Sequence, residues 1–502
     1  MHKILKYVTY INVFQCLSWL GLALFILPAK GHFLYDEAYF YNEASEIARN
    51  FLIPHFSVSI SGSSPLTFTP GGAFYFIISL PFHFFSHPQT GTVWLILLSV
   101  FGILFFDLSL RKINADKALR FFLIFFLVWG AWHAKLVDRI WNVNLYFFSS
   151  LFLISFTIRY IFEDQQKQFR NAFFWGIFAS INLQIHFGGS IIVACCLTMI
   201  LFKSFKSIFS KNMLAVVSAT ILMYSPYLIY EIKNNFSNTK LLMSLSQHSR
   251  YFNSVNVEHA MISLFTFLAG FQYPQEIKTI FERSWSDLDK AAIFNLVTTF
   301  LVILFVLVRF STNRRKNSLF FFVPFAFSAL FFYLTKRDFQ PHYIASTVPL
   351  MLIFAGVSFF LLWEMSSFAK KIVVPLVGLS LFSQTFVWVD LYQNYSRVMI
   401  SDWVSLSEKV IEENEKPSDE SSEQNGIVVP WKRNKPDAFI TWAVAKNHFN
   451  KKLRFQLYSD SICTVNLGSE LSKEDILIDF NSYFSCVNPL QGEPAGEDST
   501  RS

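Results

Sequence analysis

Charged residues are scarce in this chain of 502 residues. Only 15% of the residues are charged, whereas 53% are hydrophobic and 18% aromatic, and the mean hydropathy is +0.38. An ordinary soluble domain carries about 25% charged residues. The composition therefore excludes a typical soluble protein and indicates a chain that mostly faces lipid or other buried helices.

Cysteine and recognised cofactor motifs are also scarce. The five cysteines show no metal-type spacing with histidine, so the sequence predicts no structural metal site. Cys16, Cys195 and Cys196 lie in apolar segments, where a thiol packs as a small hydrophobe. Cys463 and Cys486 lie in a polar region and are the plausible disulfide pair if that region is exterior.

Nucleotide- and nucleic-acid-binding signals are missing as well. The sequence has neither a phosphate-binding Walker loop nor a dinucleotide fingerprint. The net charge of +7 is spread over short loops between apolar runs, which is typical of membrane topology signals. We therefore expect no nucleic-acid partner.

About eleven apolar runs are long enough to cross a bilayer, which takes about 20 residues. They lie at 8–28, 89–110, 119–135, 140–162, 172–187, 188–203, 213–230, 291–310, 318–335, 342–363 and 371–391. Gly188 and Gly189 divide one long run into two. The first run has no signal-peptide cleavage site and predicts a retained anchor.

The run 73–86 decides the predicted topology. It has about 14 residues and contains Pro81, so it is short for a span. If it stays on one side, the cationic loops lie on the same side as Lys3, as the positive-inside rule requires. These loops carry Arg111, Lys112, Lys117, Arg120, Lys167, Arg170, Lys203, Lys206, Lys211, Arg314, Arg315, Lys316, Lys370 and Lys371. We predict an interfacial or re-entrant helix on the outer face and a cytoplasmic N-terminus.

The composition changes after residue 392. The predicted organisation is a transmembrane domain over 1–392, an exterior α/β domain over 393–490 and a disordered tail over 491–502. The transmembrane domain contains a first exterior loop at 29–88 and a large exterior loop at 231–290. In the C-terminal domain, GIVVPW, KLRFQLY and DILIDF predict short strands, with a helix over 436–449 between the first two.

The stretch FLYDEAYFYNEASEIARN, residues 33–50, predicts a helix along the membrane surface that opens with two carboxylates, Asp36 and Glu37. Its apolar face is formed by Phe40, Ala44, Ile47 and Phe51. An acidic residue at the start of a helix can be a simple cap. The pair therefore has a structural interpretation beside a catalytic one.

In the predicted topology, ionisable groups from distant segments reach the exterior side. They are Asp36, Glu37, Asp138, Arg139, His186, Glu231, Lys233, Lys336, Arg337 and His342. Each alone is explained by a snorkelling cation, a cap or a buried histidine. Ionisable groups at membrane level are costly and tend to mark function, and their gathering on one face favours a site.

The chemistry of such a site suits a lipid-linked donor that enters sideways from the bilayer. Cations would stabilise a phosphate as it leaves, and a carboxylate would take the proton of an attacking acceptor hydroxyl. A series of short motifs fits this picture. In chain order they are DEAYFYNEASEIARN, SSPLTFTPGGAFYFIISLPF, DRIWNVNLYFF, LQIHFGG, SPYLIYEIKNNFSNTK and PHYIASTVPL.

These motifs, in this order over residues 20–350, resemble those of the GT-C integral-membrane glycosyltransferases. The likeness is to the branch of protein O-mannosyltransferases and the lipid A aminoarabinose transferase, which use polyprenyl-phosphate sugars. One departure is Val143, where the family's Arg-Trp-Asn-Pro stretch has proline.

The resemblance implies an all-α polytopic fold and an inverting hexosyl- or pentosyltransferase of the plasma (inner) membrane. The acceptor would be a hydroxyl of a glycolipid, polysaccharide or protein on the exterior face. Asp36 would be the general base, and Glu37 would orient acceptor or donor sugar. The remaining implied roles are phosphate binding for Arg139, Lys233 and Arg337, and pocket lining for Asp138, His186, Glu231, His342 and Tyr343. No cofactor is required; some relatives bind a divalent metal, for which Glu37 and His186 are candidate ligands.

A transporter or flippase of lipid-linked sugars is the alternative function. Transporters usually place ionisable groups near the middle of the bilayer, whereas 291–308 and 342–363 contain no acidic or basic residue other than His342. A purely structural or sensor protein would leave the two charged pairs, at residues 36–37 and 138–139, unexplained. Both observations favour an enzyme with an exterior site.

Overall fold

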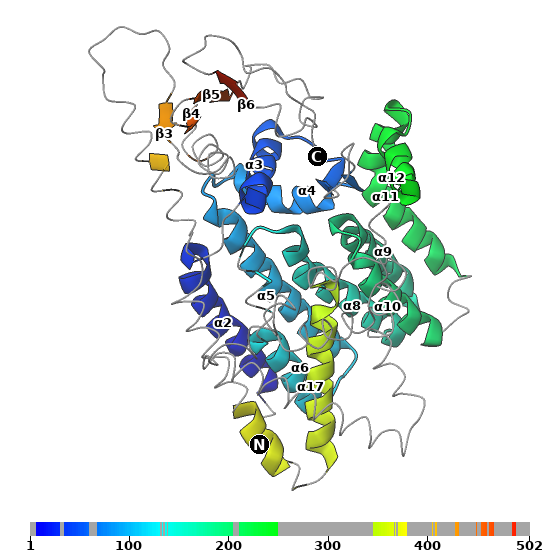
Figure 1. The fold of residues 1–502 in the computed structure, drawn as a ribbon. Coiled ribbons are helices and arrows are strands. Elements are labelled where there is room, and N and C mark those ends of the chain that lie inside the picture. The colour runs from blue at the N-terminus through cyan, green and yellow to red at the C-terminus, as the bar shows by residue number, and fades with distance from the viewer. Residues whose placement is uncertain are drawn as a thin grey trace. The chain divides into compact units, whose positions relative to one another are not determined.

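The computed structural model describes most of the first half of the chain and selected later segments (Figure 1). The described residues are 7–30, 35–59, 68–130, 133, 136–137, 139–203, 210–248, 345–365, 367, 370–378, 404, 407–408, 427–430, 448, 453–458, 461–465 and 484–487. They form two compact units. The first contains Met1–Pro28, Ile53–Ile77 and Thr92–Tyr395, and the second contains Ala29–Leu52, Ile78–Gly91 and Ser396–Ser502.

The first unit is built mainly of helices, as the sequence predicts. Its long helices are α2 (Val8–Lys30), α5 (Gln89–Lys112, begun in the other unit), α6 (Lys117–Trp129), α8 (Tyr146–Phe162), α9 (Gln165–Ile185), α10 (Gly189–Lys203), α11 (Lys211–Lys233), α12 (Ser237–His248) and α17 (Val348–Met365). Five helical stretches among the described residues are long and apolar enough to cross a membrane. The predicted spans 291–310 and 318–335 lie outside the described residues, and so does most of 371–391.

Two predicted helix boundaries have different outcomes. The division at Gly188 and Gly189 is confirmed, because α9 ends at Ile185 and α10 begins at Gly189. A Cβ at Gly189 would lie only 2.0 Å from the carbonyl oxygen of Asn182, so the close approach of the two helices requires glycine. The predicted span 119–135 is too long, because α6 ends at Trp129 and Gly130 is extended.

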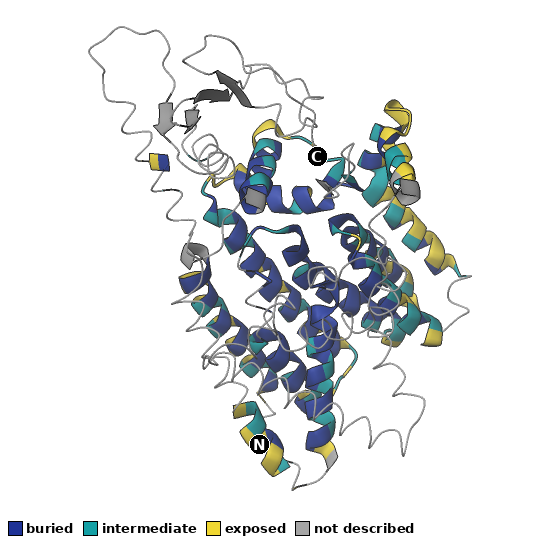
Figure 2. Ribbon diagram, in the orientation of Figure 1, coloured by how far each residue is buried: buried dark blue, intermediate teal, exposed yellow. Residues whose placement is uncertain are grey.

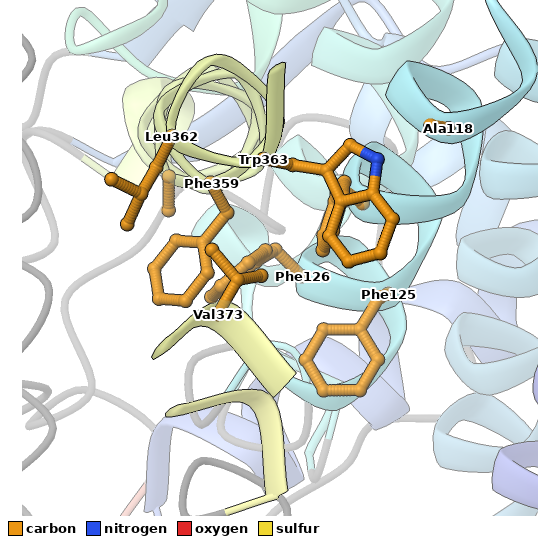
Figure 3. Close-up of a cluster of buried hydrophobic side chains, with 9 residues drawn as sticks. Ala118, Phe125, Phe126, Phe359, Leu362, Trp363 and Val373 are labelled. Carbon is orange, nitrogen blue, oxygen red and sulfur yellow. The ribbon is translucent and has the colours of Figure 1, made fainter. Parts of the chain in front are cut away.

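Buried aromatic side chains join the helices of the first unit. Ribbon coloured as buried runs along many of these helices in Figure 2. Helix α9 packs against α8 and α11, and α6 packs against α17. The contact between α6 and α17 forms a cluster drawn in Figure 3. Its members are Ala118, Phe122, Phe125, Phe126, Ala355, Phe359, Leu362, Trp363 and Val373. Gly356 allows this contact, since a Cβ there would lie 2.9 Å from backbone atoms of α6.

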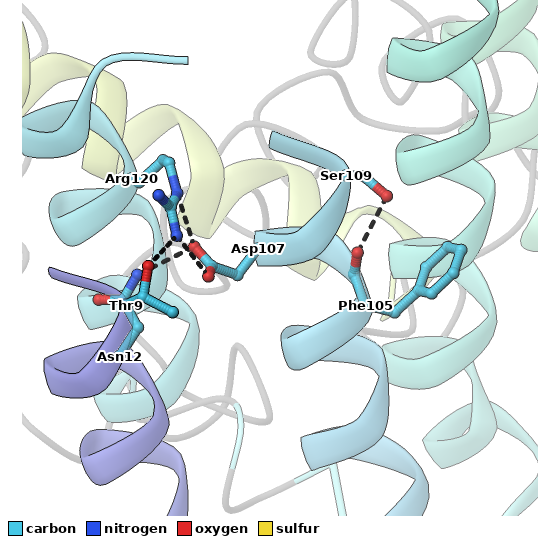
Figure 4. A network of polar contacts seen from close by, with 6 residues as sticks. All are labelled: Thr9, Asn12, Phe105, Asp107, Ser109 and Arg120. Atoms are coloured by element: carbon cyan, nitrogen blue, oxygen red, sulfur yellow. Dashed lines mark hydrogen bonds and ion pairs between the residues drawn. The ribbon is translucent and has the colours of Figure 1, made fainter. Parts of the chain in front are cut away.

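One buried polar contact also links helices of the first unit. Arg120 of α6 forms an ion pair with Asp107 of α5, and both residues contact α2 (Figure 4). The sequence interpretation of Arg120 as a loop cation is therefore wrong. The side chain is buried in a helix and already has an acidic partner.

A short hairpin extends the first unit. Strand β1 (Phe56–Ser59) pairs antiparallel with β2 (Phe68–Pro70). Ser57 donates a hydrogen bond to the carbonyl of Ile185 (3.4 Å), which ties the hairpin to the end of α9.

The second unit contains the helix that opens with the carboxylate pair. Helix α3 (Tyr35–Asn50) forms where the sequence predicts it, and Phe40, Ala44 and Ile47 of its apolar face are buried. The prediction for Phe51 is wrong: it is 82% exposed and has a φ of 51°. The amide of Leu52 donates to the carbonyl of Ile47 (3.0 Å), which closes α3 with a Schellman-type turn and places Phe51 beyond the helix.

The predicted interfacial segment is a pair of short helices. Helix α4 (Ala73–Ser79) continues into the 3-10 helix η1 (Leu80–His83). At about 1.5 Å per residue this stretch is shorter than the roughly 30 Å of a bilayer core. Its place at the outer face stays a prediction.

Four strands near the C-terminus form one sheet. They are β3 (Ile427–Pro430), β4 (Leu453–Tyr458), β5 (Ser461–Val465) and β6 (Phe484–Val487), in the order β3-β4-β5-β6. The first two are the strands predicted from GIVVPW and KLRFQLY, and they are parallel. Strands β5 and β6 were not predicted, and DILIDF lies outside the described residues.

Candidate active site

Some predicted site residues belong to the first unit, some to the second, and others lie outside the described residues. Asp36 and Glu37 are in the second unit, in the first turn of α3. The first unit holds the four described candidates that come from other segments: Arg139, His186, Glu231 and Lys233. The candidates outside the described residues are Asp138, Arg337, His342 and Tyr343. These four residues are the described candidates that share one unit with candidates from another segment.

Helix α3 carries the carboxylate pair on a firmly held segment. Glu37 is only 3% exposed, and the backbone of Asp36 lies within the same helix. The hydroxyl of Tyr41 donates to the carbonyl of Ser86 (2.7 Å), and its ring packs edge-on against Phe82 (5.5 Å between centroids). These contacts fix α3, which carries the pair in its first turn, to η1 and the segment after it.

Arg139 lies in the loop that leads into α8. Its guanidinium lies over the ring of Trp141, 4.7 Å from the centroid, an arrangement that leaves the cation's charge intact. Asn144 donates to the carbonyl of Arg139 (3.0 Å), and Asn142 donates to the carbonyl of Ile185 (3.2 Å). The loop is therefore attached to the end of α9.

His186 follows α9 directly and has an extended backbone. The hydroxyl of Tyr146 donates to the His186 carbonyl (2.6 Å), and the Gly188 amide donates to the His186 Nδ1 (3.2 Å). When Nδ1 accepts this bond, the proton of the neutral imidazole is on Nε2. Ser346 donates to the carbonyl of Gly188 (2.7 Å), which brings the turn before α17 to the same place.

Gln184 lies where three helices meet and is not among the predicted site residues. Its Oε1 accepts a hydrogen bond from the amide of Ala73 (3.1 Å), and its Nε2 donates to the carbonyl of Met223 (3.0 Å). One carboxamide thus joins α4, α9 and α11. Gly71 makes room for it with a φ of +90°, since a Cβ there would lie 2.3 Å from the Gln184 side chain. The glutamine of LQIHFGG was the available signal.

Glu231 holds the corner between α11 and α12. It is buried, and its carboxylate accepts hydrogen bonds from the amides of Asn238 (3.2 Å) and Thr239 (2.8 Å). The corner passes through Asn235 and Phe236 at φ of 54° and 58°, a conformation that non-glycine residues seldom adopt. Glu231 is therefore a helix cap in this structure, and its predicted place in a pocket stays a prediction.

An aromatic shelf lies next to this corner, and Lys233 at the end of α11 is the exposed cation among the described candidates. The ring of Phe56 contacts those of Phe68, Tyr227 and Tyr230, with centroids 4.7 to 5.8 Å apart. The Asn238 carboxamide bonds both the amide and the carbonyl of Phe68 (3.0 and 3.1 Å). The hairpin is thereby tied to α12.

His55 is a second residue that the sequence interpretation missed. Its ring lies against Tyr230, with centroids 5.3 Å apart. Burial lowers the pKa of His55 below its usual value, the charge of Lys233 lowers it further, and a hydrogen bond with the Pro226 carbonyl opposes them. No periodic or motif signal in the sequence marks this histidine.

The described part of the chain contains no group of residues that forms a metal site. Within it, no group of three or more histidine, cysteine, aspartate or glutamate residues could hold a metal ion. The candidate ligands Glu37 and His186 belong to different units. A divalent metal stays a prediction.

Comparison with known proteins rests on the fold, because no family model and no curated protein matches the sequence. The structure has a GT-C type of fold, as the sequence motifs predict. The solved structures that it resembles include ArnT from Cupriavidus metallidurans in the apo state, with 10% identity and a TM-score of 0.59. A second structure is the same protein bound to undecaprenyl phosphate, with 9% identity and a TM-score of 0.56. Each match covers 89% of this chain and 85% of that chain.

Proposed function

We propose that the protein is a membrane glycosyltransferase that moves a sugar from a polyprenyl-phosphate donor to an acceptor hydroxyl on the exterior face of the plasma (inner) membrane. The observation that carries this proposal is the GT-C fold over 89% of the chain. The similar structure of ArnT with undecaprenyl phosphate supports a lipid-linked donor. The acceptor would be a glycolipid, a polysaccharide or a protein.

In this proposal the acceptor oxygen attacks the anomeric carbon of the donor. The new carbon–oxygen bond forms as the bond to the phosphate oxygen breaks, and polyprenyl phosphate leaves with that electron pair. Attack from the opposite face inverts the configuration. The carboxylate of Asp36 takes the hydroxyl proton, and the buried Glu37 next to it orients the sugar or the acceptor.

The cations balance the charge that develops on the leaving phosphate. Arg139 is supported by the Trp141 ring, and Lys233 extends from the end of α11. Arg337 is a third phosphate ligand in the proposal. The sugar or acceptor pocket would take Asp138, His186, Glu231, His342 and Tyr343.

The test is a transfer assay with purified protein, radiolabelled polyprenyl-phosphate sugars and a membrane acceptor extract. We expect Asp36→Asn to reduce turnover by about a hundredfold or more, because asparagine retains the capping ability of aspartate and loses its basicity. Asp116→Asn is the matched control, since Asp116 caps α6 by accepting from the amides of Ala118 and Leu119 (2.7 and 3.1 Å). Full activity of Asp36→Asn would contradict the assignment of the base. Movement of intact donor across vesicles without sugar transfer would identify the transporter instead.

A further inference from the structure

His55, Tyr230 and Lys233 form one surface of the first unit. Tyr230 and Lys233 are three residues apart on α11, so they lie on the same side of its last turns. The ring of His55 lies against that of Tyr230, with an angle of 30° between the planes. The amide of Gly71 donates to the carbonyl of His55 (3.0 Å), which fixes the backbone beneath the ring.

Lys233 gives this surface a positive charge, and no ion pair among the residues that the structure describes balances it. Neither His55 nor Lys233 forms an ion pair with a residue that the structure describes. The closest carboxylate in sequence, that of Glu231, is buried and accepts from two amides of α12. A neighbouring cation disfavours the protonated imidazole, and a bound anion would reverse that effect.

The side chain of His55 also contains an atom whose hydrogen-bonding capacity is unused. Its Nδ1 is buried and has no hydrogen-bond partner. Among the described residues, the elements next to His55 contribute the following titratable or charged groups. Helix α11 contributes Tyr230, Glu231 and Lys233, and β2 contributes none; α9, which packs on β1, ends at Ile185 and is followed by His186.

We propose that His55 and Lys233 together form a proton-linked site for a phosphate group, in which His55 takes up a proton at Nδ1 as the anion binds. The ligand chemistry is the phosphate of the polyprenyl phosphate that leaves in the reaction, so this inference rests on the proposed function. Lys233 supplies one positive charge at all times, and protonated His55 supplies a second one only when the phosphate is bound. The charge on His55 favours the dianionic polyprenyl phosphate over the singly charged polyprenyl-phosphate sugar. It thus stabilises the negative charge that develops on the phosphate during transfer.

Proton linkage gives this proposal a signature that a packing role does not have. Without ligand His55 is neutral at pH 7, because burial and Lys233 hold its pKa below 6.5. A bound anion raises that pKa. At a pH between the pKa of His55 in the free protein and its pKa in the complex, binding is accompanied by uptake of a proton. One linked proton increases affinity by up to about tenfold for each unit by which the pH falls in this window.

The experiment measures binding of undecaprenyl phosphate to the full-length protein in detergent between pH 5.5 and 8. Wild type is compared with His55→Phe, which keeps a ring against Tyr230 and cannot take a proton. The ligand phosphate titrates equally in the measurements on wild type and on His55→Phe. The ratio of the two affinities therefore reports the contribution of His55 to the pH dependence. We expect wild type to bind several-fold more tightly at pH 6 and equally at pH 8. Lys233→Met should weaken binding at every pH.

His83→Gln is the matched control, because His83 is an exposed histidine in the other unit that stacks on Phe51. It should retain the wild-type pH dependence. A ratio of wild type to His55→Phe that is constant over the pH range would overturn the proposal and leave His55 as a packing residue.

Two further measurements separate the possible sources of phosphate and the two proposals. Inorganic phosphate should show the same dependence on His55 but bind more weakly than undecaprenyl phosphate, since it lacks the polyprenyl chain. Equal affinities for inorganic phosphate and undecaprenyl phosphate would assign the site to free phosphate and overturn the lipid-phosphate assignment. Proton-linked binding in a protein that transfers no sugar would overturn the proposed function and support this site. Sugar transfer with a constant affinity ratio would overturn this site alone.

Discussion

The guanidinium of Arg120 on α6 forms a two-bond ion pair with the carboxylate of Asp107 on α5. The Nε–Oδ1 distance is 3.0 Å and the Nη2–Oδ2 distance is 2.6 Å, and both residues are almost fully buried. Asn12 of α2 donates to the same carboxylate (2.9 Å), and Thr9 accepts from the guanidinium (3.3 Å). One ion pair therefore joins three helices.

Breaking this pair from one side should destabilise the protein strongly. Asp107→Asn leaves the guanidinium buried without its counter-charge, a change that typically costs about 3–5 kcal/mol. We expect a clear loss of thermal stability in detergent, and a double variant Asp107→Leu/Arg120→Met that recovers part of it. Asp164→Asn is the control, because Asp164 pairs with Lys167 at the surface and such pairs contribute little. Equal melting temperatures for Asp107→Asn and wild type would contradict the importance of the pair.

Removal of the Asn238 side chain should release the β1–β2 hairpin from α12. Asn238→Ala leaves the amide and carbonyl of Phe68 without their partner, at a cost of about 1–3 kcal/mol. Hydrogen exchange should accelerate at the Phe68 amide, with the spanning helices unchanged. Asn234→Ala is the control, since the Asn234 side chain donates to the carbonyl of Tyr230 at the end of its own helix. An unchanged rate at Phe68 would show that the hairpin is held by the aromatic shelf alone.

The contact between His87 and His448 should weaken in acid. Their ring centroids are 4.7 Å apart within the second unit. Burial lowers the pKa of both residues; His448 lowers that of His87 further, while Glu408 opposes the effect on His448. A depressed histidine pKa means that the contact is fully stable above about 6.5 and is lost as the pH falls through the folded-state value.

Limited proteolysis after residue 395 checks this pH dependence. Wild type should be cleaved faster at pH 5 than at pH 7.5. His87→Phe keeps an aromatic ring without a proton-binding nitrogen and should reduce the difference. The same pH dependence in both proteins would exclude the histidine pair as its cause.

Cys463 and Cys486 should form a disulfide if their segment is exterior. They lie directly opposite each other in the antiparallel pair β5–β6. Opposite residues in such a pair have Cα atoms about 4.5–5.5 Å apart, within the roughly 4.4–6.8 Å of disulfides. We expect the unreduced, denatured protein to contain three free thiols of its five cysteines, those of Cys16, Cys195 and Cys196. Five free thiols would rule out the bridge.

The sequence by itself determined the features that depend on local pattern. Apolar runs long enough for a bilayer became α2, α5, α8 and α11, because each such run must satisfy its backbone hydrogen bonds within itself. The spacing of Phe40, Ala44 and Ile47 fixed the buried face of α3. The order of the motifs indicated the GT-C fold that the solved structures support.

Tertiary structure decided which distant residues meet. Gln184 bonds Ala73 across 111 residues of sequence, and Asn238 bonds Phe68 across 170. His55 contacts Tyr230 only because the hairpin packs on α11. Arg120 lies buried in a helix and not in the predicted loop, because Asp107 gives it a buried partner. A periodic pattern says which side of a helix is apolar. The partner of a buried polar group is set by helix packing, since its hydrogen bonds must be satisfied wherever the fold places it.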